Sequence, residues 1–312
     1  MIALLRTLMG VSVVGGLVVV VLWSENQMAV KTPAHIHFHA HARDSPENSP
    51  LPSLISIGKE VVTRKPTTAT AAANVAELTR LSQTLMLVPN LHWLVVEDAV
   101  SPTRRVLTFL DTCTVPHTYL LGTASRKYKG ANKPRGVSNR NAGLQWLKGH
   151  AKDGVVYFAD DDNTYDYRIF NEIRSTRQVS MFPVGLVTRL GVSSPIVSNG
   201  KLVGFYDGWV AGRKFPVDMA GFAVNFRFYL QRNGPMMPYN VGFEEDGFLK
   251  ALKINPEDIE PLADNCTKIL VWHTRTVKSM PALKMPEKER VTKTNLHYLK
   301  EQIVFQMSHG LS

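Results

Sequence analysis

The stretch VVYFADDD, residues 155–162, is an apolar run that ends in the consecutive carboxylates Asp160, Asp161 and Asp162. The length of the run and its β-branched and aromatic content are typical of a buried strand. Three neighbouring carboxylates repel one another, and a divalent cation such as Mg²⁺ or Mn²⁺ removes that penalty. Ligands of open α/β sheets bind beyond the carboxyl ends of strands, so we expect a metal-assisted ligand site here. A solvated acidic turn before a helix is the alternative.

Composition indicates a globular protein with an anionic ligand. Apolar residues make up 44% of the 312 residues, which is enough for one large domain or two fused lobes. The net charge of +10 suits nucleotides or acidic glycans. The sequence has no long Arg/Lys block and no zinc-finger spacing, so no nucleic-acid partner is expected. Two cysteines, Cys113 and Cys266, are too few for a disulfide framework, and we interpret them as free thiols.

The N-terminal segment predicts a membrane anchor. The run LMGVSVVGGLVVVVLW, residues 8–23, is at the lower limit of length for a spanning helix, and Arg6 before it favours a cytoplasmic N-terminus. A cleaved secretory signal is the alternative, but the run is long for one and no small-x-small cleavage site follows. We therefore expect a cytoplasmic tail over 1–6, a transmembrane signal-anchor over 7–24 and a luminal stem over 25–53. Histidines alternate over positions 35–41 of the stem, and metal binding by them is a less favoured interpretation of this segment.

Hydrophobic periodicity predicts alternating strands and helices, which is typical of an α/β fold with a mostly parallel central sheet. The expected helices are 75–88, 139–147, 167–177 and 242–252. The expected strands are 92–97, 117–122, 155–159, 179–186, 203–209, 216–226 and 268–272. Asp98 follows a strand much as Asp160 does. The basic stretch KYKGANKPRGVSNR, residues 127–140, opens a helix and could hold a diphosphate, or it is a solvated basic loop.

Two kinds of catalysis fit the acidic triplet. Asp160-x-Asp162-x-Thr164 matches the DxDxT pattern of haloacid-dehalogenase-like phosphohydrolases. That motif usually opens its domain, whereas here a long ordered segment precedes it, so we do not favour it. The other pattern is the DxD site of a nucleotide-sugar glycosyltransferase, in which a metal bridges the carboxylates and the donor diphosphate.

Several further motifs make the sequence similar to one family. The strings VVYFADDDNTY (155–165), FPVDMAGFAV (215–224) and LVWHTRT (270–276) closely resemble the β-1,3-glucuronyltransferase family. LHWLVVEDA (91–99), PRGVSNRN (134–141) and PVGLV (183–187) support the resemblance, which covers about residues 75–278. It implies a two-lobed GT-A architecture, with a donor lobe over 54–165, an acceptor lobe over 166–285 and a C-terminal tail over 286–312.

The resemblance also implies roles for individual donor-site residues. Asp162 would be the main Mn²⁺ ligand, while Asp160 and Asp161 would hold the ribose and support the metal. The resemblance further implies that Asp98 contacts the uracil. Arg135 and Arg140 would line the donor site, and His273 and Arg275 would reach the diphosphate.

The catalytic base is expected in the segment Glu244-Glu245-Asp246. Glu245 keeps the family's spacing to the following apolar pair, whereas a gap-free count back from Pro256 selects Asp246. Trp209, Arg213 and Asp218 resemble acceptor-contacting positions. The alternatives are that Trp209 is a core aromatic residue and that Asp218 is a structural carboxylate.

The implied activity is an inverting, Mn²⁺-dependent transfer of glucuronic acid from UDP-glucuronic acid to a galactose 3-hydroxyl. The resemblance implies a homodimer in the Golgi membrane, single-pass type II, with a usable glycosylation sequon at Asn265. Two departures stand out: Pro66-Thr67-Thr68 lacks the family's uracil-stacking tyrosine, and Ser193-Ser194 replaces a family glutamate. The first motivates an alternative, a non-catalytic luminal paralogue that binds glycans or partners.

Overall fold

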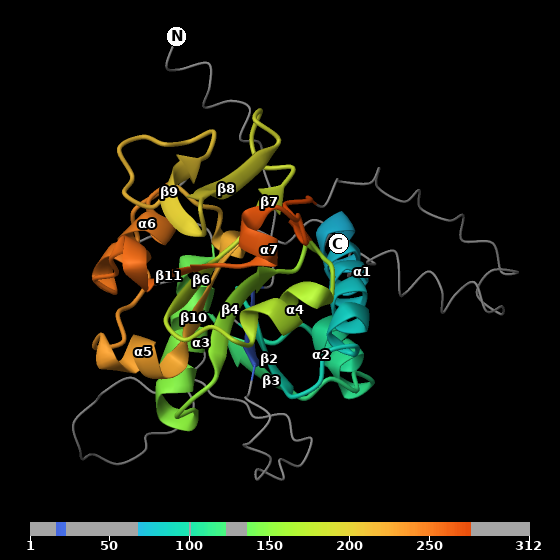
Figure 1. Cartoon of the computed structure of the whole chain (residues 1–312). Coiled ribbons are helices and arrows are strands. Elements are labelled where there is room, and N and C mark those ends of the chain that lie inside the picture. The colour runs from blue at the N-terminus through green and yellow to red at the C-terminus, as the bar shows by residue number, and fades with distance from the viewer. Residues whose placement is uncertain (1–16, 23–67, 100, 123–135, 276–312) are drawn as a thin grey trace, which may run out of the picture.

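Two β-sheets with flanking helices form the described part of the chain (Figure 1). The computed structural model describes residues 17–22, 68–99, 101–122 and 136–275. The larger sheet has seven strands in the order β11-β6-β10-β4-β1-β2-β3, and the smaller has five in the order β5-β12-β7-β8-β9. The α/β class predicted from the sequence is confirmed.

The central sheet is mixed rather than mostly parallel. Its strands are β1 (Leu17–Leu22), β2 (Leu91–Glu97), β3 (His117–Leu121), β4 (Val155–Asp160), β6 (Val179–Met181), β10 (Phe222–Asn225) and β11 (Ile259–Pro261). The β2–β3 and β6–β11 pairs are parallel, but β1 and β10 run antiparallel to both of their neighbours. Since β1 separates β2 from β4, these two strands run in the same direction and their acidic ends share one edge.

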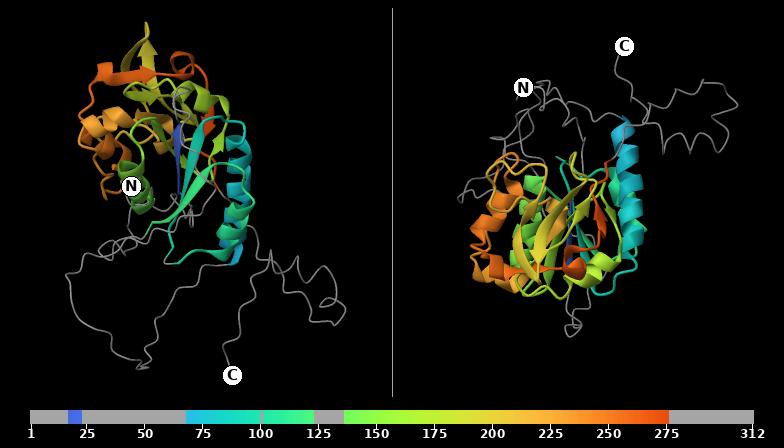
Figure 2. Two further views of the ribbon diagram at one scale, coloured as in Figure 1. Left: turned by 90° about the horizontal axis from the view of Figure 1, so that it is seen from below. Right: turned by 45° about the horizontal axis from the view of Figure 1, so that its top comes forward.

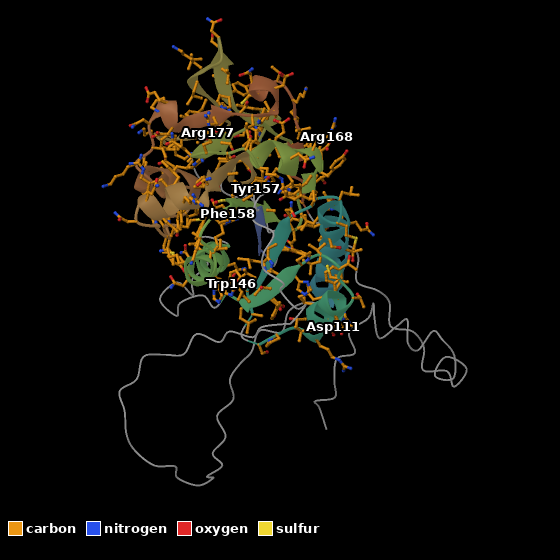
Figure 3. All side chains as sticks on the ribbon, turned by 60° about the horizontal axis from the view of Figure 1, so that its bottom comes forward. Asp111, Trp146, Tyr157, Phe158, Arg168 and Arg177 are labelled. Atoms are coloured by element: carbon orange, nitrogen blue, oxygen red, sulfur yellow. The ribbon has the colours of Figure 1, made fainter. Side chains whose placement is uncertain are left out.

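Helices cover both faces of the central sheet, and each face has its own hydrophobic core (Figures 1 and 2). The helices on one face are α1 (Thr68–Leu85), α2 (Arg104–Asp111) and α4 (Arg168–Ile173). Those on the other are α3 (Val137–His150), α5 (Phe226–Gln231) and α6 (Glu244–Ala251). Successive residues of β4 enter opposite cores, as the period of two in a strand requires: Tyr157 packs in the first and Phe158 in the second (Figure 3).

The smaller sheet joins segments that lie far apart in the sequence. It contains β5 (Thr164–Tyr165), β7 (Val184–Gly185), β8 (Val192–Ser198), β9 (Lys201–Tyr206) and β12 (Val271–Trp272). β12 lies between β5 and β7, so the segment after the acidic triplet and the His-x-Arg motif are hydrogen-bonded neighbours. Short elements complete the fold: η3 (Met219–Gly221), η4 (Pro256–Asp258) and α7 (Ala263–Cys266).

Two strands expected from the sequence differ in the structure. The expected strand at 179–186 is divided into β6 and β7, and the expected strand at 216–226 begins with η3 before β10. The sequence also gave no expectation for α2 or for β8. Both cysteines, Cys113 and Cys266, are free, as predicted.

Part of the expected membrane anchor is a strand in this structure. Leu17–Leu22 pairs along its full length with β2 and with β4, although the expected helix covers 7–24. Its valine-rich sequence suits a strand, because β-branched side chains favour extended backbone. Among the described residues, no helix combines the length and the apolar character needed to cross a membrane. Residues 7–16 and 23–24 of the expected anchor, the stem and Pro66-Thr67 lie outside the described residues.

The pairing of β1 predicts that Leu17–Leu22 stabilises the central sheet. Removal of residues 1–22 would leave facing edges of β2 and β4 without hydrogen-bond partners. Each lost bond costs about 0.5–1.5 kcal/mol. We expect the truncated chain to unfold at a lower temperature than the full chain, measured by circular dichroism.

A chain that lacks residues 286–312 is the control for this truncation, and it should keep the transition temperature of the full chain. A cooperative transition at an unchanged temperature after removal of residues 1–22 would contradict a stabilising role for β1.

Candidate functional site

The backbone of the acidic triplet is fixed from three directions at the end of β4. The Tyr165 hydroxyl donates to the Asp160 carbonyl at 2.9 Å, and the Thr274 hydroxyl donates to the Asp162 carbonyl at 2.5 Å. From α1, the Arg80 guanidinium donates to the Asn163 carbonyl at 3.2 Å. These bonds hold the turn in place, with Asp161 buried and with Asp160 and Asp162 partly exposed.

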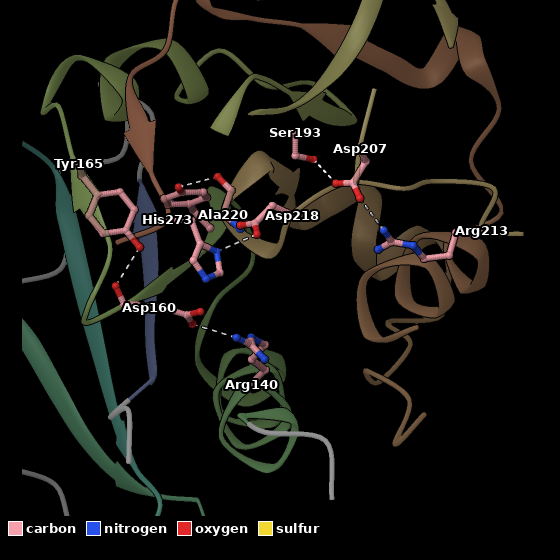
Figure 4. Close-up of polar contacts among 10 residues, drawn as sticks. Arg140, Asp160, Tyr165, Ser193, Asp207, Arg213, Asp218, Ala220 and His273 are labelled. Atoms are coloured by element: carbon pink, nitrogen blue, oxygen red, sulfur yellow. Dashed lines mark hydrogen bonds and ion pairs between the residues drawn. The ribbon is translucent and has the colours of Figure 1, made fainter. Parts of the chain in front are cut away.

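Arg140 brings a cation to the triplet from the first turn of α3. Its Nη2 donates to Asp160 Oδ1 at 2.8 Å, and the Arg140 side chain is largely buried (Figure 4). Gly136, the N-cap of α3, has φ +70°, and a Cβ there would lie 2.8 Å from Arg140 Nη1. Asn139 ties the same turn to β2, since its amide donates to the Val96 carbonyl at 3.2 Å. The helix start is therefore docked against the strand ends.

Asp218 and His273 form the second ion pair of the site. His273 Nδ1 lies 2.9 Å from Asp218 Oδ2, and the other Asp218 oxygen caps η3 by accepting from the Ala220 N–H (Figure 4). The backbone N–H of His273 donates to the Gly185 carbonyl of β7. The hydrogen bond to Asp218 raises the pKa of His273 against the effect of burial. Burial would raise the pKa of Asp218, but His273, the Ala220 N–H and the Arg140 charge together lower it.

Glu245 stands on the first turn of α6 with a strongly shifted pKa. Burial raises that pKa to about 7, and the negative charges of Asp218 and Glu244 add to the shift while Arg140 opposes it. The charges of Asp218 and Arg140 both act on Glu245, so it lies within electrostatic reach of the two ion pairs. A carboxyl with a pKa near 7 is suited to take up a proton at neutral pH.

Asp246, the alternative base, has a structural environment. Its side chain is fully buried; Oδ1 accepts from the Phe215 N–H at 2.9 Å, and Oδ2 lies 2.6 Å from Lys250 Nζ. Both oxygens are thus engaged within the protein, which favours Glu245 as the group available to a ligand.

The acceptor-side residues lie on the loop between β9 and η3. Trp209 is 44% exposed, so it is not the core aromatic residue of the alternative interpretation. A Cβ on Gly242 would lie 3.5 Å from Trp209 Nε1, which places the indole next to the start of α6. Arg213 is buried in an ion pair with Asp207, a residue that sequence reasoning did not single out.

The other predicted residues occupy scattered positions. Asp98 is exposed just after β2, Arg275 is exposed and its charge acts on His273, and Asn265 of the sequon is exposed. Arg135 lies outside the described residues. The structure therefore brings together Arg140, Asp160, Asp218, Glu245 and His273, with the rest of the triplet beside them.

The triplet has the chemistry of a partial site for Mn²⁺. Across the described ranges, no group of three or more His, Cys, Asp or Glu side chains is arranged to hold a metal by itself. A cation that also binds a diphosphate needs only one or two protein carboxylates. Asp162 is partly exposed and its carbonyl is held by Thr274, and Asp160 precedes it by two residues, so the carboxylate oxygens present fit such a cation.

Comparison with known proteins agrees with this geometry. Residues 81–277 match the model of glycosyltransferase family 43, which covers more than half of the chain and all of the site described above. The chain belongs to glycosyltransferase family 43. A haloacid-dehalogenase-like phosphohydrolase is thereby excluded as the family of this domain.

Three similar proteins share the name galactosylgalactosylxylosylprotein 3-beta-glucuronosyltransferase. Form P of Drosophila melanogaster is 53% identical over 232 residues, which is 73% of this chain and 48% of the relative. Form S from the same organism is 47% identical over 71% of this chain and 55% of the relative. Human form 3 is 46% identical, covering 68% of this chain and 69% of the relative. The chain thus spans about half the length of the two Drosophila proteins.

The ion pair predicts a coupled titration of His273. Because Asp218 is the main cause of the raised pKa of His273, Asp218→Asn should lower that pKa, since burial then acts unopposed by the carboxylate. The imidazole of a buried histidine is followed by the pH dependence of its NMR chemical shifts.

Asp153→Asn is the matched control, because Asp153 pairs with Arg227 near the opposite end of β4. It should leave the His273 titration unchanged. The same titration curve for His273 in wild type and Asp218→Asn would refute the coupling.

Proposed function

We propose that this chain transfers glucuronic acid from UDP-glucuronic acid to the 3-hydroxyl of a terminal galactose, with inversion at the anomeric carbon. Family membership and the names of the relatives support this reaction class. The observation that carries the proposal is Glu245, a carboxyl with a pKa near 7 on which the charges of Asp218 and Arg140 both act. This is the arrangement that an inverting transfer needs for its base.

Glu245 is the proposed general base. As the galactose oxygen attacks the anomeric carbon, the hydroxyl proton moves to the Glu245 carboxylate and the bond from that carbon to the diphosphate oxygen breaks. UDP leaves from the opposite face with the electron pair of the broken bond. The neighbouring negative charges of Asp218 and Glu244 raise the basicity of Glu245 and so favour this proton transfer.

Fixed cations and a metal would stabilise the leaving UDP. Asp162 is the proposed Mn²⁺ ligand, with Asp160 and Asp161 in support, and the bound metal would neutralise charge on the diphosphate. His273, whose positive form is favoured by Asp218, and Arg275 are the proposed partners of the same phosphates. These groups are held before the reaction, so little reorganisation is needed as charge develops.

The proposed acceptor is a galactose-ended glycan, either the Gal-Gal-Xyl region of proteoglycans or a glycoprotein Gal-GlcNAc end. The relatives' name mentions the galactosylgalactosylxylosyl form. Trp209 offers an exposed aromatic face next to α6, where a sugar ring could lie. Radiolabelled transfer to Galβ1-3Gal and to Galβ1-4GlcNAc would separate the two acceptors.

Replacing the base should stop transfer without preventing donor binding. Glu245→Gln keeps the shape of the side chain but cannot take a proton, so we expect at least an approximately 100-fold fall in transfer. In wild type, kcat/KM should rise tenfold per pH unit below about pH 7 and level off above it, because only the ionised form of Glu245 is active. Glu245→Gln should still bind UDP in a Mn²⁺-dependent manner, measured by calorimetry.

Asp246→Asn is the matched control. It disturbs the bonds to Phe215 and Lys250, so stability should fall by about 1–3 kcal/mol while transfer by the folded protein continues. Inactive Asp246→Asn with active Glu245→Gln would move the base to Asp246. Absence of Mn²⁺-dependent UDP binding in wild type would instead support the non-catalytic paralogue.

We also propose that the domain works in the lumen of the Golgi, attached to its membrane through residues 7–24. The exposed sequon at Asn265 supports a luminal position, while a membrane span would require Leu17–Leu22 to leave the central sheet. In animal cells, peptide N-glycosidase should increase the gel mobility of the wild-type chain but not of Asn265→Gln. Extraction of the protein by alkaline carbonate would argue against the membrane span.

A further inference from the structure

Asp207 is a buried carboxylate placed directly after β9 and away from the reacting groups. It is 7% exposed and accepts three hydrogen bonds from the protein. Oδ2 accepts from the Ser193 hydroxyl at 2.5 Å, and Oδ1 accepts from Arg213 Nη2 at 2.9 Å (Figure 4). Oδ1 also accepts from the Trp209 N–H at 2.7 Å. A buried charge with this many partners is held in one position.

The network holds the Trp209 backbone on both sides. Asp207 binds the Trp209 N–H, and the Arg213 guanidinium that pairs with Asp207 also donates to the Trp209 carbonyl. The backbone N–H of Arg213 also donates to the Val210 carbonyl at 2.8 Å, which adds a hydrogen bond within the loop. The peptide groups around Trp209 are thus bound, although the loop contains no helix or strand.

The same network is anchored to the smaller sheet. Ser193 belongs to β8 and pairs with Val184 of β7, the strand that also pairs with β12. Gly208 packs so closely on the loop after β7 that a Cβ there would lie 2.2 Å from Thr188 Oγ1. The Trp209 loop is therefore fixed relative to the strand that precedes His273.

The bound loop presents an exposed indole next to the proposed base. Trp209 is 44% exposed in spite of its fixed backbone, and it lies against Gly242, whose φ of +80° leads into α6. Glu245 follows in the first turn of that helix. Aromatic rings with an exposed face are suited to the apolar face of a sugar, and a fixed ring loses little conformational freedom on binding.

We infer that Asp207 is a positioning residue that holds the Trp209 indole as a platform for the acceptor sugar. Asp207 does not touch the sugar, because it is buried and bonded within the protein. It acts through Trp209, with Arg213 and Ser193 as its partners. This inference rests on the proposed transfer to a glycan acceptor and adds a residue for which the family resemblance implied no role.

The test is a double-mutant cycle on the full chain with Galβ1-3Gal or Galβ1-4GlcNAc, whichever wild type uses. Asp207→Asn removes the charge but keeps the shape, and we expect about a tenfold rise in the acceptor KM with kcat and donor KM within about twofold of wild type. Trp209→Ala should raise the acceptor KM at least as much. In the Trp209→Ala background, Asp207→Asn should cause no further rise, because the platform is already absent.

Asp111→Asn is the matched control, since Asp111 is exposed at the end of α2 (Figure 3). Asp111→Asn should leave kcat, the donor KM and the acceptor KM unchanged. If Asp207→Asn fails to fold, Ser193→Ala replaces it, with an expected rise of about two- to threefold that again vanishes in the Trp209→Ala background. A rise that persists in that background, or an equal rise in donor KM, would overturn the positioning role.

The outcomes for the two proposals differ. If wild type transfers glucuronic acid but the effects of Asp207→Asn and Trp209→Ala on the acceptor KM simply add, the positioning role of Asp207 is refuted and the proposed function is not. If wild type transfers nothing, acceptor affinity measured by calorimetry replaces KM in the same cycle. Failure of both transfer and acceptor binding in wild type would refute both proposals.

Discussion

The placement of carboxylates around Arg140 and His273 is the constraint on which this site depends. Asp160, Asp218 and Glu245 come from three different segments near the end of β4. Arg140 pairs with Asp160 and His273 with Asp218, whereas the pKa of Glu245 is raised to about 7, chiefly by burial and further by the charges of Asp218 and Glu244. Part of the electrostatic cost of gathering acids therefore falls on Glu245, a residue for which a higher basicity is useful.

The two sheets make this convergence mechanically stable. The triplet follows β4 of the central sheet, whereas His273 follows β12 of the smaller sheet, and Thr274 bonds across to the Asp162 carbonyl. β5 and β12 pair through Tyr165 and Val271, so the two segments cannot move independently. The donor and acceptor lobes expected from the sequence are therefore interleaved around this junction, because β6, β10 and β11 complete the same sheet as β4.

Much of the fold and most of the site could be predicted from the sequence. Strands such as 92–97 and 155–159 are buried on both faces and read as continuous apolar runs, so their positions were clear. The direction of the strands could not be predicted, since the antiparallel insertion of β10 between β4 and β6 depends on long-range pairing. β8 was missed because Val192–Ser198 is serine-rich and contains a proline, and only tertiary pairing makes it a strand. Asp207 was missed because no local pattern separates a buried carboxylate from a solvated one.

The antiparallel strand at the centre of the sheet ties folding to the order of synthesis. Leu17–Leu22 is made first, but one of its neighbours, β4, does not exist until residues 155–160 have been added. Until then, an apolar valine-rich segment has no complete pairing site and stays available to other apolar surroundings. Contacts between segments so distant in sequence also form slowly. A bilayer present during synthesis would therefore meet these six residues before the central sheet is complete.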